Sequence, residues 1–290
     1  MFELFNKYVT LSRTGETSGQ NQSISTQELN KASSAEDVNS LHDIIMGRHA
    51  DIALDFMEKD GVLAYIIPGL GDIVSMKDVT GKNRFKDLWW HTKLVVVQSK
   101  PKLEIRWAAL FHDFGKPSCF TIENGKVAFH NHEHASVRYF KAFARKFRIF
   151  TPEQYNKISF LIYNLGYVEA YSSTWTEPAV RRFAKDMGDN VDYLLLLSRA
   201  DTTSRNPRNR RKVQFKISEL SKRIKEVRTK DAIVPPLPKG IGNAIMDIGI
   251  SGKEIGTLKA QLEKLVQDKI LKPNQEVQYY MDYITQNAGG

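Results

Sequence analysis

The chain has 290 residues, of which 41% are hydrophobic and 26% are charged, so it can bury one large core or two small ones. This composition excludes a wholly disordered chain. No run approaches the roughly 18 apolar residues that a membrane span needs. The opening residues also lack the basic and apolar regions of a secretion signal. We therefore expect a cytoplasmic protein that has no membrane partner.

Residues 1–40 are expected to form a flexible N-terminal segment, because residues 11–40 are rich in Ser, Thr, Gln, Asn and Gly. Residues 41–86 are expected to form a helical lead-in, a segment that precedes the next domain. It consists of a helix to about residue 59, a second apolar stretch over 62–70 and a loop over 72–86.

The apolar periodicity of residues 87–204 predicts a helical domain. Its helices are expected near residues 88–99, 103–114, 133–147, 152–165, 176–187 and 190–204. Asn124-Gly125 supplies the turn of a β-hairpin between Cys119 and Phe129. After a basic helix over 205–232, residues 233–290 form a linker and three helices, near 241–248, 252–269 and 274–286. The sequence thus predicts an all-α fold with one small β-hairpin insertion and a small C-terminal helical unit.

The positive charge of the chain is concentrated in residues 205–230. This window has eleven Lys and Arg against two acids, or +9, which equals the formal net charge of the whole chain. Val213, Ile217 and Leu220 recur there at the period of one apolar helix face. A solvated amphipathic helix would explain the pattern, but the concentrated charge favours a polyanion, with RNA preferred. The expected phosphate contacts are Arg208, Arg210, Arg211 and Lys212.

Four polar residues interrupt or end strongly apolar stretches: His91, His112, Asp113 and Asp201. Burying all four unpaired would be costly. If their helices converge, two imidazoles and two carboxylates form a site for one divalent ion such as Mg, Mn, Co, Ni or Fe. The single cysteine, Cys119, excludes a cysteine-rich zinc site. Such an ion acidifies a bound water and neutralises phosphate, as phosphoester hydrolysis requires.

Taken singly, each of these residues has an ordinary explanation, since one His on an apolar helix is usually a hydrogen-bonded core residue. The ordered set is more specific. His91 is followed 21 residues later by His112-Asp113, then by Gly-Lys-Pro117, by His130-Asn-His-Glu-His134 and by a late Asp at a helix end.

This order resembles the metal-binding signature of the HD phosphohydrolase superfamily. More narrowly, residues 43–285 resemble the C-terminal part of bacterial tRNA nucleotidyltransferases, the CCA-adding enzymes that carry an HD domain. The matching segments are Leu88-Trp-Trp-His-Thr92, Leu103-Glu-Ile-Arg-Trp-Ala-Ala-Leu-Phe-His-Asp-Phe-Gly-Lys-Pro117, Phe129-His-Asn-His-Glu133, Trp175-Thr-Glu-Pro-Ala-Val-Arg-Arg-Phe183 and Ala200-Asp-Thr-Thr-Ser-Arg-Asn206.

The resemblance implies that His91, His112, Asp113 and Asp201 are the metal ligands. It also implies that Lys116 holds a substrate phosphate and that His132 and Glu133 line the pocket, with a helical body that helps to grip tRNA. His112, Asp113, Lys116 and His132 would form the catalytic set.

Two positions depart from the family pattern. Phe85 and Leu165 stand where the family commonly has histidines, so we expect a mononuclear site. Without a Gly-Ser loop and paired carboxylates on a strand, the chain is expected not to add nucleotides by itself. A separate nucleotidyltransferase is then a possible partner.

Several further residues are weaker candidates. Arg181 and Arg182 would be phosphate contacts or solvent-exposed arginines. His130 and His134 would lie beside the site or at the surface. His42 and His49 are seven positions apart on one expected helix, too far to share an ion, and are expected at the surface.

The leading hypothesis is a metal-dependent phosphodiesterase or phosphatase that acts on the phosphate ends of RNA or tRNA, such as a 2′,3′-cyclic phosphate or a terminal monophosphate. One alternative is a non-catalytic module that binds tRNA or a partner protein. The other is an HD hydrolase of a free signalling nucleotide.

Overall fold

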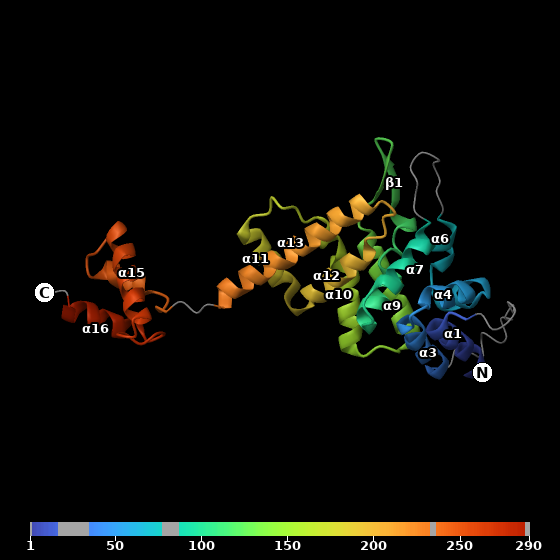
Figure 1. Cartoon of the computed structure of the whole chain (residues 1–290), viewed down its shortest axis with the longest axis horizontal. Helices are drawn as coiled ribbons and strands as arrows, with labels where there is room; N and C mark the ends of the chain where they lie inside the picture. The colour runs from blue at the N-terminus through green and yellow to red at the C-terminus, as the bar shows by residue number, and fades with distance from the viewer. Residues whose placement is uncertain (1, 17–34, 77–86, 233–235, 288–290) are drawn as a thin grey trace. The chain divides into compact units, whose positions relative to one another are not determined.

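The computed structural model describes residues 2–16, 35–76, 87–232 and 236–287 (Figure 1). This part of the chain is mostly helical and has one two-stranded antiparallel hairpin, which confirms the expected fold class. It divides into two compact units, one ending at Lys225 and the other beginning at Glu226. None of the described helices combines the length and the apolar character that crossing a membrane requires.

The N-terminal residues do not form the expected flexible segment throughout. Helix α1 (Phe2–Thr14) packs against α3 (Ala35–Met46) and α4 (Ala50–Lys59), and its Phe5, Tyr8 and Leu11 are buried. The prediction for residues 1–40 is therefore wrong at α1 and at the start of α3. It failed because apolar residues spaced three and four apart before residue 12 already mark a helix face. Residues 17–34 lie outside the described part.

Tyr8 attaches α1 to the end of α4. Its hydroxyl donates a hydrogen bond of 2.7 Å to the Asp60 carboxylate, which also pairs with Lys7 at 2.9 Å. Burial and the neighbouring Asp60 carboxylate raise the pKa of Tyr8, so the phenol stays protonated and donates. We expect Tyr8→Phe to lower the free energy of unfolding by about 1–3 kcal/mol, because the hydrogen bond to the buried carboxylate is lost. Urea unfolding measures this change; Lys7→Met, which removes only the half-exposed partner, should cost less.

The segment after α4 is more helical than expected. Helix α5 (Val62–Ile66) and helix α6 (Leu70–Ser75) follow, so the start of the predicted 72–86 loop is helical. Residues 77–86, including Phe85, lie outside the described part. The expectation that His42 is a surface residue is also wrong. His42 accepts a hydrogen bond from the indole of Trp107 at 2.9 Å, and its other ring nitrogen lies 3.0 Å from the Ile149 carbonyl.

Six longer helices build the middle of the chain, near the predicted positions: α7 (Leu88–Gln98), α8 (Leu103–Phe111), α9 (His132–Phe147), α10 (Pro152–Glu169), α11 (Glu177–Met187) and α12 (Val191–Asp201). Their beginnings follow from capping. Asp87 caps α7, Thr151 forms a capping box on α10, and Thr176 caps α11. Helices α7, α8 and α12 pack against one another, and α10 packs on α8 and α12.

The predicted hairpin is present between α8 and α9. A short 3-10 turn, η1 (Pro117–Cys119), leads into β1 (Phe120–Glu123), which pairs with β2 (Lys126–Phe129). Asn124 and Gly125 both have positive φ angles, +52° and +73°, as the two-residue turn requires. Cys119, at the end of η1, is half-buried.

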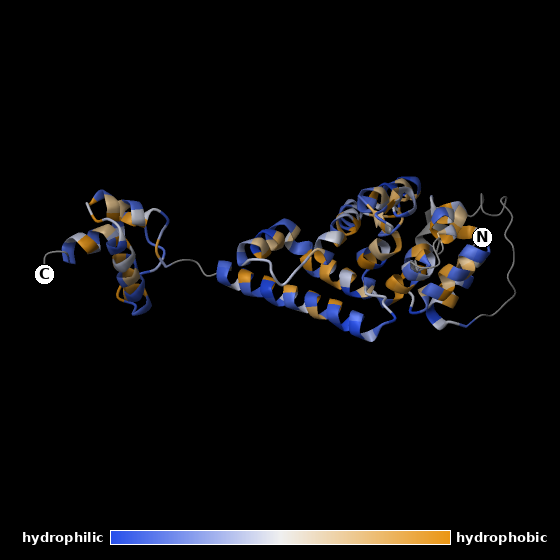
Figure 2. Cartoon of the chain, turned by 90° about the horizontal axis from the view of Figure 1, so that it is seen from above, coloured by the Kyte–Doolittle hydropathy of each residue, from blue (hydrophilic) through white to orange (hydrophobic). Residues whose placement is uncertain are grey.

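The basic segment forms one long helix, α13 (Pro207–Ala232). Figure 2 shows it as largely hydrophilic, with hydrophobic residues along one edge. Ile217, Leu220 and Ile224 are buried as the periodicity predicts, but the Val213 side chain is 41% exposed. Val213 is exposed because it lies on the wall of a cavity.

The C-terminal unit contains α14 (Ile241–Asp247), α15 (Lys253–Gln267) and α16 (Val277–Asn287), close to the three predicted helices. Its core includes Ile245, Leu262, Tyr280 and Ile284. The Tyr280 hydroxyl donates to the Lys272 carbonyl at 2.7 Å, which ties α16 to the preceding loop.

Candidate metal centre

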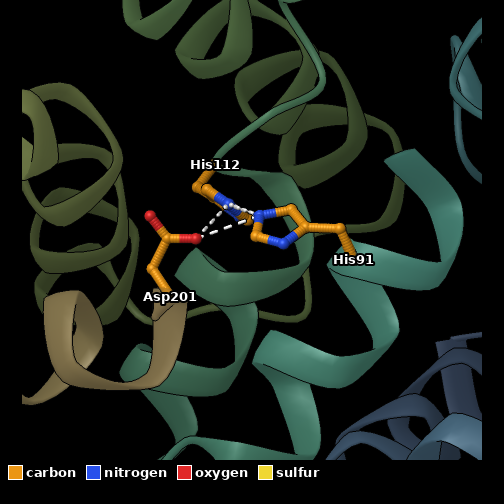
Figure 3. A group of neighbouring side chains, drawn as sticks. All are labelled: His91, His112 and Asp201. Atoms are coloured by element: carbon orange, nitrogen blue, oxygen red, sulfur yellow. Dashed lines mark hydrogen bonds and ion pairs between the residues drawn. The ribbon is translucent and has the colours of Figure 1, made fainter. Parts of the chain in front are cut away.

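Two histidines and an aspartate converge at one point (Figure 3). His91 lies in α7, His112 follows directly after α8, and Asp201 is the last residue of α12. Asp201 Oδ1 lies 3.0 Å from His91 Nε2 and 3.4 Å from His112 Nε2, and the two Nε2 atoms are 3.2 Å apart. Both histidines are buried. Among the described residues, this is the group of His, Cys, Asp or Glu side chains whose ligand atoms lie close enough to hold a metal ion.

The far sides of both imidazoles are held by hydrogen bonds. His112 Nδ1 lies 2.7 Å from the Ala109 carbonyl, so it carries a proton and donates it, and His91 Nδ1 lies 2.8 Å from the Thr203 hydroxyl. These contacts orient both Nε2 atoms toward Asp201. Metal-binding histidines have this arrangement, in which the second ring nitrogen is fixed by a polar partner. The donor set therefore fits a divalent ion that accepts nitrogen and oxygen ligands.

Asp113 lies beside this group, but it is not one of the three residues that converge. Its Oδ2 is 3.4 Å from the Nε2 atoms of both histidines and 2.7 Å from the Lys116 ammonium. Burial would raise the pKa of Asp113, but the charges of His112 and Lys116 outweigh it and hold that pKa well below its usual value. The structure therefore places Asp113 within reach of an ion at the site, with a carboxylate that stays ionised.

The metal-free cluster holds a proton where an ion would bind. Burial would lower the pKa of His112, but Asp113 and Asp201 raise it to about 10. For Asp201, burial would raise the pKa, but hydrogen bonds from His112 and His91 hold it well below its usual value. At neutral pH the cluster thus contains a protonated His112 between two carboxylates.

His132 lies beside the cluster, but neither His132 nor Glu133 is among the described residues that line the cavity next to it, so the pocket-lining role that the resemblance implied is not observed. His132 Nε2 is 3.8 Å from Asp113 Oδ1, and His132 Nδ1 donates to the Phe129 carbonyl at 2.9 Å. The start of α9 can approach so closely because residue 115 is glycine. A Cβ atom at Gly115 would lie 2.1 Å from the His132 carbonyl oxygen. A larger residue at position 115 would therefore clash with the start of α9, which explains the glycine of the His-Asp-Phe-Gly-Lys segment.

The cluster opens into a cavity of about 530 Å³. Its polar lining includes His91, Asp113, Asp201 and Lys116. Further hydroxyl and charged side chains alternate with apolar ones around the rest of the lining, and the wall formed by α13 comprises Val213, Lys216 and Ile217. The basic helix therefore borders the same cavity as the predicted metal ligands.

Other predicted substrate contacts lie elsewhere. Arg181 pairs with Glu177 at 2.9 Å, and Arg182 lines a separate hollow with Trp175, so neither lines the cavity of the cluster. His130 pairs with Glu123 on the hairpin at 2.9 Å, and His134 packs edge-on against Tyr163. On α13, Arg208, Arg210, Arg211 and Lys212 are exposed and do not line the cavity.

Two ionisable side chains that line the cavity are absent from the sequence-based candidates. Glu169, the last residue of α10, lines the cavity; burial and the neighbouring Asp201 raise its pKa to about 8. The predicted helix ended at residue 165, so one more helical turn would have placed Glu169 on the same side as Leu165. Lys216 was counted among the charges of α13, and no local signal distinguished it from its exposed neighbours.

Comparison with known proteins does not assign this chain to a family: no family model matches it, and neither does any curated protein.

The proton on His112 predicts a pH-dependent metal affinity. The ion must displace that proton to reach Nε2, so Mn²⁺ affinity should rise about tenfold for each pH unit below about pH 10, per proton released. Calorimetry in buffers of different protonation enthalpy counts the released protons. An affinity independent of pH would contradict this assignment.

Since the folded pKa of His112 lies above its unfolded value of 6.5, the metal-free protein should lose stability as pH rises from about 6.5 to about 10.

Proposed function

We propose that this chain is a metal-dependent phosphohydrolase of the HD type that acts on the phosphate ends of RNA, with tRNA as the preferred partner. The observation that carries the proposal is one cavity lined jointly by His91, Asp113, Asp201, Lys116 and the basic helix α13. His112 also belongs to the cluster, although it does not line the cavity. The order of these residues along the chain resembles the HD signature, which supports the same reaction class.

Each residue has a role that follows from its contacts. His91, His112 and Asp201 would hold a divalent ion, and Asp113 lies within reach of it. When bound, such an ion activates water and offsets phosphate charge. Lys116 is the cation beside the site, and its pairing with Asp113 keeps its ammonium aimed at the cavity. Lys116, positioned by Asp113, would thus orient the phosphate before its bond to the ribose oxygen breaks.

A panel of substrates tests this proposal. The metal-loaded protein is incubated with RNA oligomers ending in a 2′,3′-cyclic phosphate, a 2′-phosphate or a 3′-phosphate, and with free cyclic and linear nucleotides. We expect ring opening or phosphate release at RNA ends. Turnover of free nucleotides without turnover of RNA would indicate a signalling-nucleotide hydrolase instead.

A second function is favoured by one separate observation. Arg208, Arg210, Arg211 and Lys212 are exposed on α13 and lie outside the cavity, so they can bind RNA whether or not the cluster is active. A non-catalytic module that holds tRNA, or tRNA together with a separate nucleotidyltransferase, would show RNA binding and bound metal without turnover of any member of the panel.

A further inference from the structure

Two lysines line the cavity, and they differ in their partners. Lys116 is engaged by Asp113 at 2.7 Å. Lys216, which enters the cavity from α13, has no hydrogen-bond or ion-pair partner among the described residues. Its ammonium charge is therefore free to bind an anion from the ligand.

The two cations come from different parts of the chain. Lys116 lies between α8 and the hairpin, whereas Lys216 lies in α13. Among the described residues that line the cavity, Lys116 and Lys216 are the two lysines, and each is supplied by a different element. Because Lys116 is already paired with Asp113 beside the cluster and Lys216 is supplied independently by α13, each lysine can serve a different phosphate of one ligand.

The rest of the lining suits a nucleoside. Apolar side chains, including Phe129, Val168 and Val213, offer a surface for a base or a sugar face. Ser204 also lines the cavity. Its Oγ accepts a hydrogen bond from the Asn206 amide at 3.3 Å, which leaves the hydroxyl proton available to a ligand oxygen.

We propose that Lys216 binds a second phosphate of the same nucleotide, so that the cavity selects a nucleotide with phosphates on both sides of one ribose. This is the chemistry of the last nucleotide of an RNA that ends in a phosphate. The inference rests on the proposed function for the reaction at the cluster. The binding preference itself depends on Lys216 and needs no turnover.

The test compares a nucleoside 3′,5′-bisphosphate with the 3′-monophosphate and the 5′-diphosphate of the same nucleoside. Calorimetry measures their binding to the metal-free protein, and initial rates give KM with Mn²⁺ present. The variant Lys216→Met keeps most of the apolar stem but removes the charge. Lys225→Met, an exposed lysine on the same helix that does not line the cavity, is the matched control.

We expect the wild type and Lys225→Met to prefer the bisphosphate over the monophosphate by about tenfold, the effect of one charge-assisted contact. In Lys216→Met this preference should vanish, with KM raised and kcat nearly unchanged. Equal binding of bisphosphate and monophosphate by the wild type would overturn the inference, as would a preference that survives Lys216→Met. Diphosphate binding as tight as that of the bisphosphate would also overturn it.

The same experiment separates this inference from the proposed function. A Lys216-dependent preference without hydrolysis of any ligand would support the second phosphate site and reject the phosphohydrolase. Hydrolysis of bisphosphate and monophosphate with equal KM would support the phosphohydrolase and reject the second phosphate site.

Discussion

Replacing His112 with alanine is expected to reduce phosphate release from RNA ends by at least about 10³-fold while RNA affinity changes less than about twofold. The loss is large because His112 Nε2 is one of three converging ligand atoms and because its positive charge balances Asp113 and Asp201 when no ion is bound. The affinity is retained because the exposed arginines that we expect to contact RNA lie on α13, outside the cavity. Single-turnover rates and filter binding on the same preparation measure the two effects.

His130→Ala is the matched control for this variant, since His130 is an exposed histidine paired with Glu123 on the hairpin. It should keep wild-type turnover. Elemental analysis after loading with Mn, Co or Ni should find about one ion per wild-type chain and less in Asp113→Ala. Full activity of His112→Ala would show that the site is wrongly assigned, and no metal in either protein would leave only the RNA-binding module.

Replacing Arg208, Arg210, Arg211 and Lys212 together by glutamine is expected to weaken RNA binding by roughly 10²- to 10³-fold at about 0.1 M salt. Each contact to a single-stranded phosphate contributes about 0.7 to the slope of log affinity against log salt, so four lost contacts lower the slope by about 2.8. All four side chains are exposed on the first turns of α13. A salt titration of binding measures both quantities.

A control with the same change in net charge removes four exposed cations from other elements: Lys59, Lys100, Arg145 and Lys185. This variant should bind RNA with nearly the wild-type slope, because scattered charges act only through the long-range field. Identical slopes for wild type and the α13 variant would mean that the basic helix is only a solvated surface. Cleavage of a short nucleotide substrate should be the same in all three proteins.

The cluster was predictable because its residues conflict with their surroundings. A histidine or aspartate within a strongly apolar helix requires a partner, and His91, His112 and Asp201 find theirs in one another. The hairpin was predictable for a similarly local reason, since Asn124-Gly125 specifies a turn type. The hairpin signal is contained within a few residues, whereas the cluster became specific only through the order of its residues between positions 91 and 201.

The remaining features depend on which helices meet, and local patterns do not contain that information. Glu169 belongs to the site because α10 continues one turn further and packs on α12, next to Asp201. Lys216 belongs to the cavity because α13 lies beside the residues that follow α12. Helix α1 was missed because the polar residues that follow it dominated the composition of the first 40 residues.

The position of Cys119 has a practical consequence. It is the only cysteine of the chain, it is half-buried, and it ends the short turn that begins directly after Lys116. A thiol-reactive spin label would therefore attach at one place, a few residues from the cavity, without any mutation. Since Mn²⁺ is paramagnetic, dipolar broadening between the label and the ion would report their separation. That distance would test whether the ion lies at the His91, His112 and Asp201 cluster, independently of any substrate.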